Sequence, residues 1–484
     1  KLKYIISATF SLLLLNGCTD LSETLYDKVD SSDYGKTPAE IETIVGSVYS
    51  SLRGGASDGV NFFPTDEFVF FVGAISSDEC VIPTRVGGDW YDDGVYIELQ
   101  KHTWTPDNPK IWAPWKYCYN GVAAANAVIY QVENSGLDPE SSRPLFAELK
   151  ALRAYYYYKL LDYYGNVPIE TSYVVAEAPA TSPRADVFKF VEEELLDNID
   201  FLPESGYGRF TKNAANLLLA RLYLNAEVYI GQPRWQDCIN VCSKISGQLE
   251  PDYYKSFSTD NHTSKEIIFS IPYDSKVTNA GNYLASMTYH YEQKYAFSAT
   301  GNYQWCGNGI SAQPGLYSAF EDADMRKKSV MMGPQINLST GSVIIMPASG
   351  EPLIYTEEIE DINRALQNEG GRLSKYEDKE GDSWSRDYDM VLMRYAEVLM
   401  MQAECYVRLG NTAAARSFVE QIRTRAGLTT PENITLEFID EELRREFVFE
   451  DHRRTDNIRF GTFFNAWWEK AADTGKYTGL FPIP

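Results

Sequence analysis

The chain has 484 residues, enough for roughly three domains of ordinary size or for one large repeat domain. Asp and Glu number 68 against 44 Lys and Arg, giving a net charge of -24 at pH 7. Such a surface repels phosphate backbones and argues against nucleic-acid binding. Aromatic residues make up 14% of the chain, with tyrosine in clear excess. Tyrosine has an apolar face and a polar tip, which suits both helix packing and flat, partly polar ligands.

Residues 1–17 have the pattern of a bacterial lipoprotein signal peptide. A basic head (Lys1, Lys3) precedes an apolar run, Ile5 to Leu15, that is too short to span a bilayer. The run ends in Leu15-Asn16-Gly17-Cys18, the residue order of a lipobox. We therefore expect Cys18 to carry lipid and residues 18–36 to form a tether, so that the protein works outside the cytoplasm on a membrane surface. The alternative is an ordinary buried N-terminal helix with a stray cysteine.

Helical periodicity follows the tether. Thr37 is a typical N-cap ahead of Pro38, and the helix that it begins should run to about Leu52. Further helices are predicted over 112–132, 144–164 and 182–199.

Several predicted helices carry an alanine three residues before a tyrosine. The small residue lets a neighbouring helix approach, and the aromatic ring on the same face fills the adjacent groove. The clearest pairs are Ala154/Tyr157, Ala220/Tyr223 and Ala403/Tyr406. After the last pair, Gly410 ends one helix and Asn411 or Thr412 caps the next, which is the spacing of a tetratricopeptide helix pair. The sequence therefore predicts a mainly α fold, a tetratricopeptide-like helical-repeat scaffold over about 37–53, 112–247 and 390–428.

Two long irregular segments interrupt this scaffold, at about 54–110 and 250–389. They are rich in Gly, Asn, Asp, Ser and Pro and contain short β-rich pieces such as Glu266 to Ile271. Long irregular stretches in a compact protein usually carry function. We therefore expect a helical frame with loop-rich, ligand-bearing insertions.

Six cysteines follow Cys18 at irregular spacing. Cys238 and Cys242 are four residues apart on a predicted helix, where a zinc-binding pair can be imagined. The chain has only 4 histidines, and none is near this pair in the sequence. We expect packed thiols there, with no metal and no cofactor.

The C-terminal third carries motifs of one family. They are 389–400, Arg423 to Leu428, Leu443 to Arg453 and the closing 480–484, and two upstream segments, 78–91 and 153–168, continue the pattern. In this order, and together with the lipobox, they closely resemble the SusD/RagB family of Bacteroidetes outer-membrane lipoproteins. The resemblance implies one SusD-like domain over 37–484 and a non-enzymatic lipoprotein on the outer membrane, facing the cell exterior. It also implies that the protein binds oligosaccharide and delivers it to a SusC-like TonB-dependent transporter.

A sugar ring has an apolar C–H face and a rim of hydroxyl groups, so its site needs an aromatic platform and polar partners. Loop 85–105 supplies both, and the resemblance adds a second region around 283–308. We predict that Trp90, Tyr91 and Trp305 stack on sugar rings and that Arg85, Asp89 and Asn308 bind the hydroxyl rim. The alternative for each tryptophan is structural, because a loop Trp can simply pin its loop to the scaffold.

Other functions fit the sequence less well. A glycoside hydrolase needs two carboxyl groups at a set separation, and adjacent acids such as Asp92 and Asp93 rarely face one another. Tetratricopeptide arrays commonly bind peptides, and some members of the family import peptides, so a peptide cargo stays open. Some members also bind calcium near positions comparable to Asp274, Asp387 and Asp389, but the sequence lacks EF-hand spacing and we predict no metal.

Overall fold

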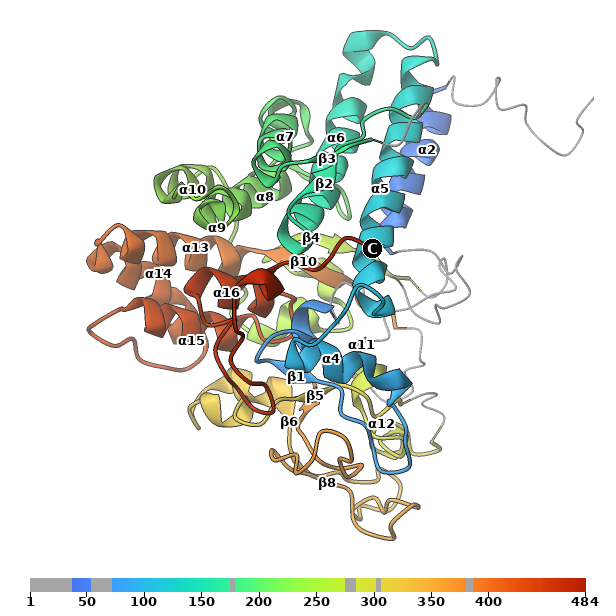
Figure 1. Cartoon of the computed structure of the whole chain (residues 1–484), viewed down its shortest axis with the longest axis vertical. Helices are drawn as coiled ribbons and strands as arrows, with labels where there is room; N and C mark the ends of the chain where they lie inside the picture. The colour runs from blue at the N-terminus through green and yellow to red at the C-terminus, as the bar shows by residue number, and fades with distance from the viewer. Residues whose placement is uncertain (1–36, 54–71, 175–178, 275–283, 302–305, 379–385) are drawn as a thin grey trace, which may run out of the picture.

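The computed structural model describes residues 37–53, 72–174, 179–274, 284–301, 306–378 and 386–484. The predicted signal peptide, Cys18, the tether and Trp305 lie outside these residues. The described chain is mainly α-helical, as predicted, and most of its helices pack against their sequence neighbours (Figure 1). The frame helices are α2 (Pro38–Ser51), α5 (Pro109–Glu133), α6 (Pro139–Tyr163), α7 (Arg184–Leu196), α8 (Lys212–Leu224), α9 (Ala226–Ile230), α10 (Trp235–Cys242), α13 (Tyr395–Arg408), α14 (Thr412–Arg425), α15 (Leu436–Glu446) and α16 (Arg453–Phe460).

Local capping explains where these helices begin. Thr37 forms a capping box with Glu40 at the start of α2, as the sequence predicted. The Asn411 side chain accepts a hydrogen bond from the Ala414 N–H at 3.1 Å and caps α14. The predicted start of α6 at residue 144 is wrong, because the Asp138 side chain caps the helix and Pro139 opens it.

The alanine–tyrosine pairs lie inside the helix packing. Ala154, Ala220 and Ala403 are all completely buried. The Tyr406 ring of α13 stacks on Phe418 of α14 at 5.8 Å between centroids. α6 approaches α5 closely at Gly121, where a Cβ atom would lie 2.1 Å from the Tyr156 ring. The scaffold interpretation of these residues is confirmed.

Short elements make up the two irregular segments. They are α4 (Val95–Lys101), α11 (Leu284–Thr288) and α12 (Lys294–Phe297), with the strands β1 (Cys80–Val81), β5 (Ser311–Ala312), β6 (Val330–Met331), β7 (Gly333–Pro334), β8 (Ile354–Tyr355) and β9 (Arg372–Leu373); β2 (Val167–Pro168) and β3 (Thr181–Ser182) lie in the frame. Each strand pairs antiparallel with one partner: β1 with β5, β2 with β3, β6 with β9 and β7 with β8.

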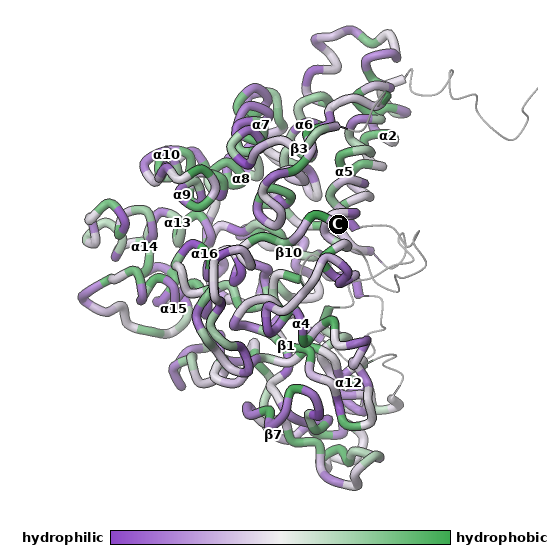
Figure 2. Tube along the Cα trace, viewed as in Figure 1, coloured by the Kyte–Doolittle hydropathy of each residue, from purple (hydrophilic) through white to green (hydrophobic). Residues whose placement is uncertain are grey.

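One strand pair connects the frame to the long second insertion. β4 (Ile267–Ile271) runs antiparallel to β10 (Met390–Arg394), and β10 leads directly into α13. The described residues between them lie in the lower part of Figure 1, together with β1 and α4. Within the described residues no helix is long and apolar enough to span a membrane, and Figure 2 shows hydrophilic and hydrophobic residues interspersed along the helices.

A buried ion cluster lies where the second insertion meets α14 and α15. Its members are charged groups whose side chains are at most 4% exposed: Glu266, Arg326, Arg394, Arg425, Glu446 and Glu450. Glu446 is its centre, accepting from Arg394 at 2.6 Å, from Arg326 at 3.0 Å and from Arg425. Burial opposes ionisation of Glu446, but the three guanidinium groups outweigh it and hold its pKa below the usual range.

Candidate functional site

The two predicted ligand regions meet in space. Strand β1, which leads into loop 85–105, pairs with β5 of the second insertion. The Trp90 indole N–H donates to the Gly307 carbonyl at 2.5 Å, and the Tyr291 hydroxyl donates to the Asp89 carboxylate. These contacts define a single face, which we call the loop face and which comprises residues 85–96, 289–291 and 306–311.

Arg85 holds the loop face together from behind. Its side chain is 1% exposed, and all five of its N–H groups donate to protein oxygen atoms. The acceptors come from two distant segments: the carbonyl groups of Asn308, Gly309, Leu366 and Glu369, and the Ser311 hydroxyl. The predicted role of Arg85 as a direct ligand partner does not fit this geometry, which makes it a positioning residue.

Asn308 also faces inward. It is completely buried, has a left-handed backbone (φ +53°), and its Oδ1 accepts from Arg372 Nη2 at 2.8 Å. Arg372, which sequence reasoning missed, is buried beside Arg85 and also donates to the Gln367 carbonyl at 2.8 Å. No local pattern separates this arginine from a solvated one, because its partners depend on the tertiary fold.

Trp90 lies where the two segments that form the loop face meet. Its ring is partly buried and lies so close to Gly309 that a Cβ atom there would be 2.7 Å from the ring. The ring also packs on Tyr96, with 5.9 Å between centroids. These contacts match the structural alternative for Trp90, in which it joins the two halves of the loop face.

Tyr91 is the aromatic residue that the loop face presents to solvent. It is 53% exposed and is flanked by the exposed carboxylates of Asp89, Asp92 and Asp93. Asp92 and Asp93 have positive φ angles of 40° and 56°, so the loop turns sharply beyond Tyr91. An exposed ring surrounded by hydrogen-bond acceptors suits a ligand with an apolar face and donor hydroxyl groups. The position of Trp305 relative to this ring lies outside the described residues.

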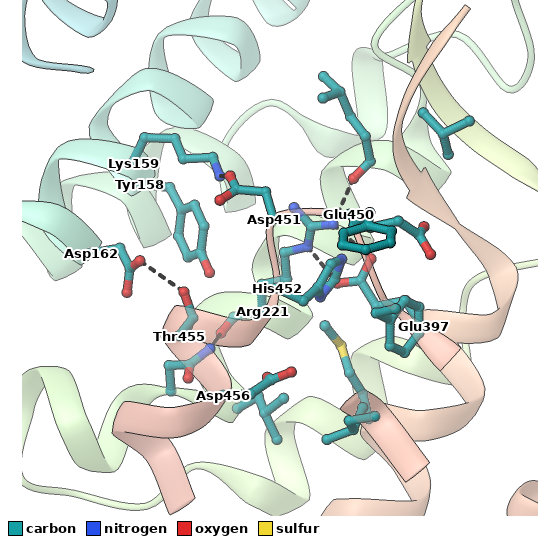
Figure 3. Close-up of a pocket in the computed structure, with 18 of the residues that line it drawn as sticks. Tyr158, Lys159, Asp162, Arg221, Glu397, Glu450, Asp451, His452, Thr455 and Asp456 are labelled. Atoms are coloured by element: carbon teal, nitrogen blue, oxygen red, sulfur yellow. Dashed lines mark hydrogen bonds and ion pairs between the residues drawn. The ribbon is translucent and has the colours of Figure 1, made fainter. Parts of the chain in front are cut away.

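A small internal cavity lies elsewhere, where α6, α8, α13 and α16 converge (Figure 3). Its accessible space is about 70 Å³, which suits a few water molecules rather than a sugar chain. Charged groups line it as ion pairs, such as Lys159 with Asp451 at 2.9 Å and Arg221 with Glu397. We therefore assign this cavity to the packing of the frame. Within the described residues no group of three or more His, Cys, Asp or Glu side chains is arranged to hold a metal ion.

Two adjacent carboxyl groups precede the loop face and differ in charge state. Burial opposes ionisation of Asp78, but Arg453, 2.6 Å away, and Arg444 lower its pKa to about 2. Glu79 is buried and accepts from the Phe449 N–H at 3.1 Å, and burial raises its pKa to about 8. At pH 7 Asp78 is therefore ionised while Glu79 carries a proton.

This difference predicts the pH response of a Glu79→Gln variant. Because folding raises the Glu79 pKa from 4.5 to about 8, its stabilising contribution is complete below pH 4.5 and is lost as the pH rises through 8. Glutamine keeps the acceptor for Phe449 but does not titrate. We expect E79Q to become progressively more stable than the wild type between about pH 6 and pH 9, measured by urea unfolding.

Asp78→Asn is the matched control. The Asp78 pKa is lowered by folding, so its contribution is present above the ordinary value of 3.8 and is lost as the pH falls through about 2. D78N should therefore be less stable than the wild type throughout the same pH range. Identical pH dependence of E79Q and the wild type between pH 6 and 9 would show that Glu79 does not carry the proton.

Comparison with known proteins shows which families this chain resembles. The model of the SusD family matches residues 265–481, and a model described as "Starch-binding associating with outer membrane" matches residues 85–224. SusD-like protein P2 of Formosa agariphila is 25% identical over 96% of this chain and 90% of its own length. The starch-binding protein SusD of Bacteroides thetaiotaomicron is 25% identical over 85% of this chain and 81% of its own.

Solved structures share the fold. Surface glycan-binding protein A from Bacteroides thetaiotaomicron superimposes with a TM-score of 0.75 at 23% identity, covering 93% of this chain and 96% of that one. The same protein in complex with laminarihexaose gives a TM-score of 0.74 at 22% identity, covering 92% and 96%. The matched segments, the relatives along the whole chain and the helical frame agree, and the chain belongs to the SusD/RagB family.

Proposed function

We propose that this protein is a surface lipoprotein that binds oligosaccharide and delivers it, unbroken, to a partner SusC-like TonB-dependent transporter of the outer membrane. The observation that carries the proposal is the loop face, where the exposed Tyr91 ring stands among the Asp89, Asp92 and Asp93 carboxylates. The glycan-binding names of the relatives and the laminarihexaose complex of a protein with the same fold support it. The lipobox supports anchoring through Cys18, with the protein facing the cell exterior.

The chemistry of this face is recognition without bond breaking. One face of a sugar ring packs on Tyr91, and its hydroxyl groups donate to the neighbouring carboxylates. Arg85 and Arg372 position these groups from behind without contacting ligand, because their hydrogen bonds go to backbone and side-chain oxygen atoms of the protein. We expect a Kd between micromolar and millimolar, which lets the ligand leave again for the transporter.

The experiment is calorimetric titration of the chain beginning after Cys18 against plant, host and microbial oligosaccharides. Replacing Tyr91 by alanine removes the exposed ring and should weaken binding roughly tenfold. Tyr130→Ala is the matched control, because Tyr130 is a 45% exposed ring near the end of α5, away from the loop face.

Each outcome separates the candidate functions. Binding that is weakened in Y91A but not in Y130A, with intact glycan recovered after the titration, supports capture at the loop face. Shortened glycan in the recovered mixture would make the protein a glycoside hydrolase. If no glycan binds and peptides bind instead, the peptide-binding alternative would be established. Purification of the lipidated protein from outer membranes should bring a TonB-dependent transporter with it.

A further inference from the structure

Three buried cysteines gather between α10 and α13. Cys238 and Cys242 lie one turn apart on α10, and Cys405 lies on α13, which packs against it (Figure 1). All three belong to one hydrophobic core and are at most 1% exposed. The Cys238 and Cys405 thiols lie close enough to shift each other's pKa, and all three cysteines are free thiols in this structure.

The register of the two helices shows which thiols face each other. The Arg408 guanidinium lies over the Trp235 ring, 5.6 Å from its centroid. Trp235 is three residues before Cys238, and Arg408 is three residues after Cys405. Contacts that advance along one helix as they go back along the other are those of antiparallel neighbours. The approach of Cys405 to Cys238 and the contact of Arg408 with Trp235 therefore fit one antiparallel register.

Disulfide geometry selects the same pair. A disulfide needs Cβ atoms about 3.5–4.5 Å apart, whereas side chains four residues apart on a helix have Cβ atoms about 5–6 Å apart. The pair Cys238–Cys242 therefore cannot close without opening α10, while the cross-helix pair has no such restriction. We propose that Cys238 and Cys405 form a disulfide bond in the exported protein, joining α10 to α13.

The bond forms by thiol–disulfide exchange with a disulfide-bearing oxidant outside the cytoplasm. The thiolate of one cysteine attacks a sulfur atom of the oxidant and releases one oxidant thiol. The second thiolate attacks the resulting mixed disulfide, so two protein thiols lose two protons and two electrons and the oxidant leaves as two thiols. Burial raises the pKa of the Cys405 thiol, which leaves little thiolate in the folded protein, so exchange takes place before α10 docks on α13. The inference rests on the proposed location of the chain and not on its ligand.

Peptide mapping of the exported, full-length lipoprotein tests the bond. Membrane-fraction protein is unfolded, alkylated without reductant and cut with trypsin, which releases residues 235–244 and 395–408 as separate peptides unless a disulfide links them. We expect the linked pair with Cys242 alkylated, about 2 Da lighter than the sum of peptide 395–408 and singly alkylated peptide 235–244, because two hydrogen atoms are lost. A Cys242→Ala variant should keep the link and assign it to Cys238, and a Cys405→Ala variant should lose it.

Thermal unfolding gives a second readout. Reductant should lower the Tm of the wild type and of C242A by about 4 °C and leave C405A unchanged. Alkylation of Cys238 and Cys405 before reduction in membrane-fraction protein would overturn the proposal, as would a link through Cys242. If the chain is absent from the membrane fraction, the proposed location fails instead, so the two failures are distinguishable.

Discussion

Replacing Glu446 by alanine is expected to destabilise the protein by about 3–5 kcal/mol, one of the largest effects available to a single substitution. Glu446 is completely buried and pairs with Arg326, Arg394 and Arg425. Alanine would leave three guanidinium groups without their shared carboxylate in a site that water does not reach. Urea unfolding of the chain beginning after Cys18 measures the loss.

The same helix offers a matched control. Glu441 lies five residues before Glu446 on α15, but its side chain is 46% exposed and its arginine contacts are long, at 3.8 and 4.0 Å. Glu441→Ala should change stability by no more than about 0.5 kcal/mol. Equal losses in the two variants would mean that the buried ion cluster does not stabilise the junction between the second insertion and α15.

The second large effect concerns ligand binding. Trp90→Ala should weaken glycan binding at least tenfold, although Trp90 is partly buried. The substitution removes the hydrogen bond to Gly307 and the ring that packs on Gly309, so Asp89 and Tyr91 lose their fixed position. Titration with the best oligosaccharide of the panel measures the change. Trp235→Ala is the control, because that ring is also partly buried but lies on α10.

A Trp90→Phe variant distinguishes positioning from direct stacking. Phenylalanine keeps an aromatic ring but has no N–H to donate to the Gly307 carbonyl. If Trp90 acts by joining the two halves of the loop face, W90F should lose most of the affinity that W90A loses. Wild-type affinity in W90F would favour direct stacking of this ring on sugar, as the sequence predicted.

Local signals in the sequence were sufficient to predict much of the helical frame. Thr37 and Asn411 cap helices through their immediate neighbours, and the alanines of the Ala-x-x-Tyr pairs mark close helix contacts because spacing along a helix determines which residues share a face. The start of α6 was predicted five residues too late, because Pro139 and Pro144 can each stand in the first turn of a helix. The Asp138 side chain caps the helix ahead of Pro139 and so sets the true start.

The candidate site was harder to predict from the sequence. Family resemblance identified two regions that do meet, but not which way each side chain points. Arg85 turns inward because its acceptors include the carbonyl groups of Leu366 and Glu369, more than 280 residues away in sequence, and nothing local indicates them. The different charge states of Asp78 and Glu79 likewise depend on Arg453 and on burial, both products of the complete fold.

The strand pair β4–β10 has a consequence for how this architecture can diversify. The pairing of Met390 with Ile271 fixes the distance between the two ends of the second insertion, whatever lies between them. Each doubling of the length of a flexible loop costs only about 0.6 kcal/mol once its ends are held together. Some contacts of segment 272–389 must be kept: Arg326 with Glu446, Lys375 with Glu450, β5 with β1, and the carbonyl groups that accept from Arg85. The rest of the segment can be lengthened, shortened or exchanged between relatives while the helices stay in place. Chimeras cut at this strand pair are therefore a direct route to new ligand preferences on an unchanged frame.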